Sequence, residues 1–186
     1  GVRLVGSEMC IRDRNMELLP SWYAVYTTSR SEKKVKARLD EAKVDNYLPL
    51  RTEYRMWSDR RKKVSFPLIP GYIFVHIPIQ DTLKVLNIPG IVTFLKEKAV
   101  PVPIPDKQID RLRLMVEHAF DEVEFTTSPV AVGDTILVKQ GSFQGLVGEL
   151  IEMRGKYKIA IRIEYFGCAL TTVPLGWVEK VKTPTL

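Results

Sequence analysis

The chain has 186 residues, enough for one medium domain or two small ones. Hydrophobic residues make up 45% and charged residues 27%, which is ordinary for a soluble globular protein. A net charge of +6 and a pI of about 9.3 permit contact with a polyanion without requiring it. The longest apolar runs, such as Tyr72–Val75, are far below the roughly 20 residues that span a bilayer. With no secretory leader in the sequence, we expect a cytoplasmic protein.

Residues that usually carry catalysis or hold metals form no recognisable set. Cys10 and Cys168 lie in no C-x-x-C pair, and His76 and His118 are isolated from each other and from cysteine. The phosphate-binding G-x-x-x-x-G-K-[ST], the nucleophile-bearing G-x-S-x-G and the zinc-binding H-E-x-x-H patterns are missing. We therefore expect a protein that is not an enzyme and that needs no cofactor and no metal.

The first 15 residues differ from the rest of the sequence. They lack periodicity and stop just before Met16, a plausible native start. We interpret 1–20 as a leader or artefact segment and leave it out of the fold prediction.

The N-terminal half begins with a strand and a helix. Trp22–Thr28 is aromatic and β-branched, which predicts a strand. Val35, Leu39 and Ala42 then recur at helical spacing, with lysines and arginines on the other face. Two further strands are predicted at Asp45–Tyr54, where Pro49 makes a break, and at Phe66–Ile77.

Between those two strands the sequence predicts a polar loop, Met56–Lys63. A short helix at Asp81–Asn87, a strand at Ile91–Leu95 and a Pro-rich extended segment at Val100–Pro105 follow. A helix capped by Asp106 closes the series. The order of elements predicts a split βαβ sandwich of the RRM-like or ferredoxin-like kind, with helices on one side of an antiparallel sheet.

A linker is predicted at 123–129, and the composition changes after it to short strands separated by glycine-bearing turns. Five short strands in about 55 residues favour a small all-β SH3-like barrel. The predicted fold class is therefore α+β, with domains at 21–122 and 130–183. The five strands are expected at Thr135–Val138, Leu146–Ile151, Tyr157–Ile163, Cys168–Val173 and Trp177–Val181.

The glycines at the start of the predicted barrel follow a specific pattern. Val132-Gly133-Asp134 precedes a strand, and Phe143 lies between Gly141 and Gly145, two residues that permit positive φ in a tight loop. Phe143 is then either a lid on the barrel or an exposed anchor. The pattern resembles the KOW motif of ribosomal proteins and transcription elongation factors. A generic SH3-like barrel with glycines at its corners is the alternative.

Three motifs in the first half occur in the order typical of one family. Trp22–Tyr26, Phe66–Val75 (FPLIPGYIFV) and Ile88–Leu95 (IPGIVTFL) resemble the first strand, the F-P-G-Y-V-F-V segment and the V-P-G-V segment of the NusG N-terminal domain. With the KOW motif behind them, the resemblance covers roughly 21–183. Val64–Tyr72 is similar to the specialised RfaH-type and UpxY-type antiterminators, except that Ile69 stands where an aromatic residue is usual.

The resemblance implies a hydrophobic cavity that docks onto the clamp helices, a coiled coil of the largest RNA polymerase subunit. The matching motifs assign its wall or rim to Tyr26, Ile69, Tyr72 and Phe94. An interface that receives a helix tip needs such apolar and aromatic anchors. The alternative is that all four belong to the core of the sheet.

A basic segment lies between the second and third predicted strands. Arg60, Arg61, Lys62 and Lys63 can neutralise phosphates, and Trp57 could stack on an unpaired base. In the NusG family this hairpin lies near the upstream DNA and the non-template strand. A solvated hairpin tip is the alternative.

The predicted function is a non-enzymatic elongation factor that acts as a transcription antiterminator, with operon-specific action of the capsule or exopolysaccharide type implied by the specialised relatives. The KOW barrel, through Gly141, Phe143 and Gly145, is expected to recruit a ribosomal protein or the termination factor Rho. The alternatives are an RNA-binding or ribosome-binding KOW module, and a NusG-like pausing or termination cofactor.

Overall fold

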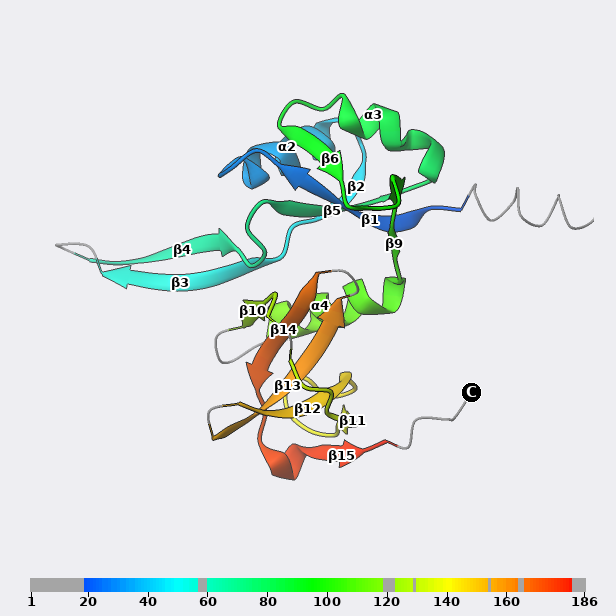
Figure 1. The fold of residues 1–186 in the computed structure, drawn as a ribbon. Helices are drawn as coiled ribbons and strands as arrows, with labels where there is room; N and C mark the ends of the chain where they lie inside the picture. The colour runs from blue at the N-terminus through cyan, green and yellow to red at the C-terminus, as the bar shows by residue number, and fades with distance from the viewer. Residues whose placement is uncertain are drawn as a thin grey trace, which may run out of the picture. The chain divides into compact units, whose positions relative to one another are not determined.

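The computed structural model describes residues 19–56, 60–118, 123–128, 130–153, 155–163 and 166–181. These form two compact units (Figure 1). The first joins the chain up to Leu48 with Pro70–Pro105, and the second joins Pro49–Ile69 with the chain from Asp106 onward. The α+β class predicted from the sequence is confirmed, since the described N-terminal elements are β-α-β and the C-terminal elements form an all-β sheet.

A five-stranded antiparallel sheet forms the first unit, with β1 at its centre. β1 (Ser21–Thr27) pairs with β5 (Tyr72–Ile77) on one side, and β2 (Asp45–Tyr47) pairs with the outer edge of β5. β6 (Ile91–Phe94) and β9 (Pro103–Ile104) both pair with β1. The long aromatic and β-branched runs of β1 and β5 are therefore buried in the middle of the sheet.

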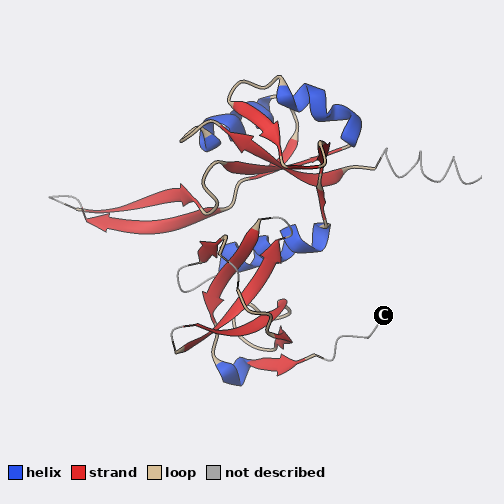
Figure 2. Ribbon diagram, viewed as in Figure 1, coloured by secondary structure: helices blue, strands red, loops and turns tan. Residues whose placement is uncertain are grey.

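Helices α2 (Glu32–Glu41) and α3 (Thr82–Leu86) lie on one face of this sheet (Figure 2). Their fully buried side chains are Val35, Leu39 and Val85, at the spacing that the sequence predicted for α2. The short helix η1 (Ile79–Asp81) leads into α3, and a two-stranded hairpin of β7 (Lys96–Glu97) and β8 (Val100–Pro101) follows β6.

The second unit contains a long ribbon, a helix and a six-stranded sheet. The ribbon pairs β3 (Leu50–Met56) with β4 (Arg61–Pro67) in antiparallel register, and α4 (Asp106–His118) packs against β13. The sheet has the order β10-β14-β13-β12-β11-β15. Its strands are β10 (Glu124–Thr126), β11 (Asp134–Val138), β12 (Val147–Met153), β13 (Lys156–Ile163), β14 (Gly167–Thr172) and β15 (Val178–Lys180), with η2 (Leu175–Trp177) before the last.

The prediction of a polar loop over Met56–Lys63 is wrong at both ends. β3 runs through Met56, and β4 already begins at Arg61. Charged side chains form a strand here because a ribbon exposed to water leaves them solvated while its backbone groups pair across the two strands. The single strand predicted over Phe66–Ile77 is in fact split into β4 and β5 by the Pro70-Gly71 turn.

The predicted linker contains a strand that the sequence did not reveal. Glu124–Thr126 forms β10 and pairs with β14, where Gly167 has no side chain and lets the Thr126 carbonyl oxygen approach closely. The Glu124 carboxylate also accepts a 2.7 Å hydrogen bond from the Lys158 ammonium. The domain boundaries at 21–122, 123–129 and 130–183 stay predictions.

The two glycines of the loop between β11 and β12 provide a matched test of this packing. Both have positive φ (81° at Gly141 and 89° at Gly145), but a Cβ at Gly141 would collide with the Trp177 ring, while a Cβ at Gly145 would meet open space. We expect Gly145→Ala to lower the free energy of unfolding by about 1 kcal/mol through strain alone. Gly141→Ala should cost about 3 kcal/mol because overpacking is added. Urea unfolding measures both, and equal losses would contradict the contact between Gly141 and Trp177.

Candidate functional site

An open hollow of about 380 Å³, which we call the Tyr26 hollow, lies in the first unit, where β1, β5 and β6 come together. Tyr26 of β1 is directly opposite Tyr72 of β5 on one side and Thr93 of β6 on the other. The two tyrosine rings lie 5.2 Å apart between centroids, tilted by 57°. The residues that line the hollow are Tyr26, Tyr72, Thr93, Phe94, Leu95 and Lys96.

The Pro70-Gly71 turn sets the position of both tyrosines. Gly71 has a φ of 81°, and its N–H donates a 2.7 Å hydrogen bond to the buried carboxylate of Glu32. The Gly71 carbonyl oxygen accepts a hydrogen bond of the same length from the Thr27 N–H. A Cβ at position 71 would lie 3.0 Å from the Tyr26 ring, so only glycine lets the turn pass this close. Local geometry thus leaves the two aromatic rings at the wall of the hollow.

The structure brings together three of the four residues that the resemblance assigned to polymerase binding. Tyr26 is 42% exposed and Tyr72 is half-buried, while Phe94 is only 2% exposed and packs edge-on against Tyr23. Phe94 therefore belongs to both the core and the lining of the hollow. Ile69 is buried in the second unit and is not among the residues that line the hollow. Its assigned role in binding stays a prediction.

Sequence reasoning missed three lining residues. Thr93, Leu95 and Lys96 flank Phe94 at the end of β6, and Lys96 begins β7. Their position just after the IPGIV segment could have indicated them. Lys96 adds a cation to a lining that is otherwise mostly apolar and aromatic, which gives the hollow one group able to pair with a carboxylate of a bound helix.

The basic residues predicted to contact nucleic acid lie on the ribbon. Arg60 precedes β4, and Arg61, Lys62 and Lys63 form its first three residues, all exposed. Trp57 lies outside the described residues. The structure places three of the four cations on β4, where the pleat directs neighbouring side chains to opposite faces, so Arg61, Lys62 and Lys63 do not form one patch.

Phe143, one of three residues expected to bind a partner of the barrel, is buried. Of the two options left open by the sequence, burial favours a lid over an exposed anchor. Gly141 approaches Trp177, and only Gly145 has open space around its Cα. That this loop binds a partner stays a prediction.

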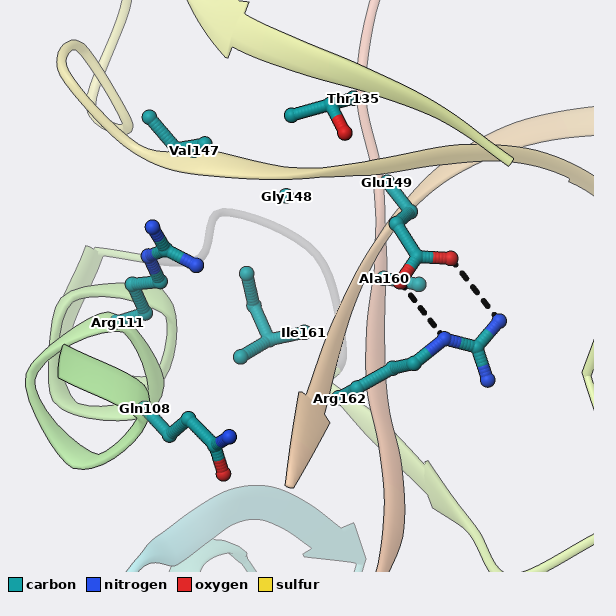
Figure 3. Close-up of a pocket in the computed structure, with 9 residues that line it drawn as sticks. All are labelled: Gln108, Arg111, Thr135, Val147, Gly148, Glu149, Ala160, Ile161 and Arg162. Atoms are coloured by element: carbon teal, nitrogen blue, oxygen red, sulfur yellow. Dashed lines mark hydrogen bonds and ion pairs between the residues drawn. The ribbon is translucent and has the colours of Figure 1, made fainter. Parts of the chain in front are cut away.

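A second hollow, of about 190 Å³, lies between α4 and strands β12 and β13 (Figure 3). Arg162 beside it makes two hydrogen bonds to the Glu149 carboxylate, of 2.7 and 2.9 Å, and donates to the carbonyl oxygens of Val130 and Ala131 at 3.0 Å. Glu149 in turn accepts a hydrogen bond from the Gly133 N–H. The carboxylate raises the pKa of the Arg162 guanidinium above its usual value. The hydrogen bonds of this pair hold the segment from Val130 to Gly133, just before β11, against the sheet.

The described residues offer neither a metal site nor a reactive cysteine. They contain no group of three or more His, Cys, Asp and Glu side chains placed to hold a metal ion. Burial raises the pKa of the Cys168 thiol, which keeps the thiol protonated and unreactive at neutral pH. None of the helices in the described ranges is long and apolar enough to cross a membrane.

Comparison with known proteins identifies the family. Residues 20–113 match the family described as transcription termination factor nusG. The chain belongs to the NusG family. This match spans β1 through most of α4 and includes every residue of the Tyr26 hollow and the whole ribbon. Members of the NusG family are transcription factors without enzymatic activity.

Individual relatives extend the likeness over most of the chain. The transcription termination/antitermination protein NusG of Staphylococcus carnosus (strain TM300) is 27% identical over 159 residues, covering 78% of this chain and 87% of the relative. The protein of the same name from Rickettsia bellii (strain RML369-C) is 26% identical over 175 residues, covering 87% and 89%. A solved structure described as "Domain interaction in Thermotoga maritima NusG" covers 89% of this chain and 99% of that one, with a TM-score of 0.51 and 21% identity, and supports the fold.

The Arg162–Glu149 pair yields a stability test. Arg162→Met should lower the free energy of unfolding by about 2 kcal/mol, because it leaves a partly buried carboxylate without its charged donor. Lys180→Met is the matched control, since Lys180 pairs with Asp134 at the exposed edge of the same sheet and such pairs contribute under about 1 kcal/mol. Urea unfolding measures both variants. Equal effects would show that Arg162 does not hold the segment before β11 in place.

Proposed function

We propose that this chain is a transcription elongation factor that docks on RNA polymerase through the Tyr26 hollow. The observation that carries the proposal is an open, aromatic-walled hollow with Phe94 in its lining, in a chain of the NusG family. The partner is the tip of the clamp helices of the largest polymerase subunit. A helix tip presents a small apolar face and exposed charges, which suits Tyr26, Tyr72 and Lys96.

The mechanism is positional. The first unit bridges the clamp helices to the opposite side of the nucleic-acid cleft and disfavours clamp opening. Such a bridge shifts the equilibrium between open and closed polymerase, so it must bind the closed form more tightly than the open one. The basic ribbon, with Arg60 to Lys63, lies along the upstream DNA or the non-template strand. The barrel recruits a ribosomal protein or Rho.

We infer antitermination as the direction of the effect, with operon-specific action of the capsule or exopolysaccharide type. The similarity of Val64–Tyr72 to specialised antiterminators supports this inference. In vitro transcription across a pause site and a terminator should show shorter pauses and more read-through when the protein is present. Longer pauses or more termination would contradict the inferred direction and favour a pausing or termination cofactor.

Removal of the aromatic walls tests the docking site. Tyr26→Ala and Tyr72→Ala should each weaken capture of polymerase by at least about thirtyfold, since truncating a central aromatic anchor typically costs 2 kcal/mol or more. Tyr157→Ala is the matched control, because Tyr157 lies on the barrel and is 40% exposed, against 42% for Tyr26. Pull-down with purified polymerase measures all three.

If Tyr26→Ala and Tyr72→Ala bind polymerase as tightly as Tyr157→Ala, the hollow is not the docking site. An RNA-binding or ribosome-binding KOW module would then become the better reading. Filter binding with free RNA would reveal it as tight, salt-sensitive binding in the absence of polymerase.

A further inference from the structure

The register of the β3–β4 ribbon sorts its residues into two faces. Residues directly opposite each other in an antiparallel pair share a face, and successive residues alternate. What we call the Tyr54 face therefore holds three cross-strand pairs, and so does what we call the Glu53 face. The Tyr54 face consists of Thr52 with Ser65, Tyr54 with Lys63, and Met56 with Arg61; the Glu53 face consists of Arg51 with Phe66, Glu53 with Val64, and Arg55 with Lys62.

The Glu53 face is largely satisfied by its own contacts. The Glu53 carboxylate pairs with Arg51 at 2.9 Å and with Arg55 at 3.6 Å. The Arg55 guanidinium also lies over the Phe66 ring, 4.7 Å from its centroid. Three cations and one carboxylate leave this face with a formal charge of +2, the same as the Tyr54 face, but two of its cations pair with Glu53 and its aromatic ring is already covered by Arg55.

The Tyr54 face holds no carboxylate to pair with its cations, and its aromatic ring is exposed. Tyr54 is 68% exposed and Met56 is 74% exposed, a large apolar exposure for neighbouring positions on one strand. Each lies directly opposite an exposed cation, Lys63 and Arg61 respectively. The six residues of this face include no carboxylate. Sequence reasoning missed Tyr54 and Met56 because it placed Met56 in a loop and treated all four cations as one run.

We propose that the Tyr54 face binds an unpaired nucleic-acid strand, with Tyr54 stacked on a base and Arg61 and Lys63 on its phosphates. This proposal rests on the proposed function and specifies which side of the ribbon makes the nucleic-acid contact. An exposed aromatic ring beside cations is the arrangement that binds single strands without sequence preference. Lys63 and Arg61 are two residues apart, about 6.8 Å along the strand, which is twice the roughly 3.4 Å rise per nucleotide of a stacked strand.

A free strand fits this face better than a duplex does. Stacking needs the open face of a base, and paired bases present only their edges in the grooves. Tyr54 should therefore contribute to binding of a single strand and not to binding of a duplex of the same sequence. The two cations should contribute to both.

The test is fluorescence anisotropy with the full chain at low salt, with labelled oligo-dT and oligo-U of 15 nucleotides and a 15-base-pair duplex. Tyr54→Ala should weaken single-strand binding about tenfold and leave duplex binding unchanged, whereas Tyr54→Phe should retain wild-type affinity. Lys63→Glu should weaken binding about tenfold. Lys62→Glu, the same charge change on the Glu53 face, should have less than a threefold effect.

The proposal would be overturned if neither single strand bound the chain. It would also be overturned if Lys62→Glu and Lys63→Glu weakened single-strand binding equally. A third contrary outcome is a Tyr54→Ala variant that loses single-strand and duplex affinity to the same extent. The third would mean that Tyr54 acts through the shape of the ribbon. Polymerase pull-down with the same variants separates this result from failure of the proposed function. Tyr54→Ala should still be captured by the isolated clamp helices, which Tyr26→Ala should not.

Discussion

The hydrogen bond from the Gly71 N–H to the buried Glu32 carboxylate is the interaction on which the shape of the Tyr26 hollow depends. A carboxylate is costly to bury without partners, and this bond gives the Glu32 carboxylate a donor in the first turn of α2. The bond fixes the turn before β5, and the Thr27 N–H holds the same turn from the side of β1. The helix and the two central strands are thereby joined at the point where Tyr26 and Tyr72 meet.

In the barrel sheet, too, a carboxylate bonded to a glycine N–H holds the backbone in place. Arg162 and Glu149 lie across adjacent strands and fasten the chain around Gly133, where a Cβ would collide with the Leu150 carbonyl oxygen. In both units a carboxylate on a helix or strand accepts a hydrogen bond from a glycine N–H, at Gly71 from Glu32 and at Gly133 from Glu149. Rigid turns of this kind let a small domain present a fixed surface, which a binding protein needs because ordering a loose surface costs affinity.

The predictable parts of the fold are those with strong local patterns. The strand at Trp22–Thr28, the helix face of Val35 and Leu39 and the five barrel strands are confirmed, because burial imposes periodicity on their sequences. β10 was missed since Glu124–Thr126 is a short strand held by tertiary pairing with β14, which leaves no periodic pattern. Only the part of the ribbon near its tip was missed, because the charged residues on strands exposed to water give no regular apolar alternation.

The candidate site was predictable only in part for related reasons. Motif order identified Tyr26, Tyr72 and Phe94, and the fold brings them to one hollow, but motif order could not separate Ile69, whose side chain is buried elsewhere. Likewise, four consecutive cations look like one patch in a sequence, while the pleat of β4 divides Arg61, Lys62 and Lys63 between two faces. Register, which depends on cross-strand pairing, is the information that a linear pattern lacks.

Hydrogen–deuterium exchange of the full chain, alone and mixed with RNA polymerase, tests the central claim most directly. Docking through the Tyr26 hollow predicts slower exchange in the backbone around Tyr26, Gly71-Tyr72 and Thr93–Lys96, with the barrel strands from β11 to β15 unchanged. Protection confined to the barrel, or polymerase binding without protection at the hollow, would contradict the account.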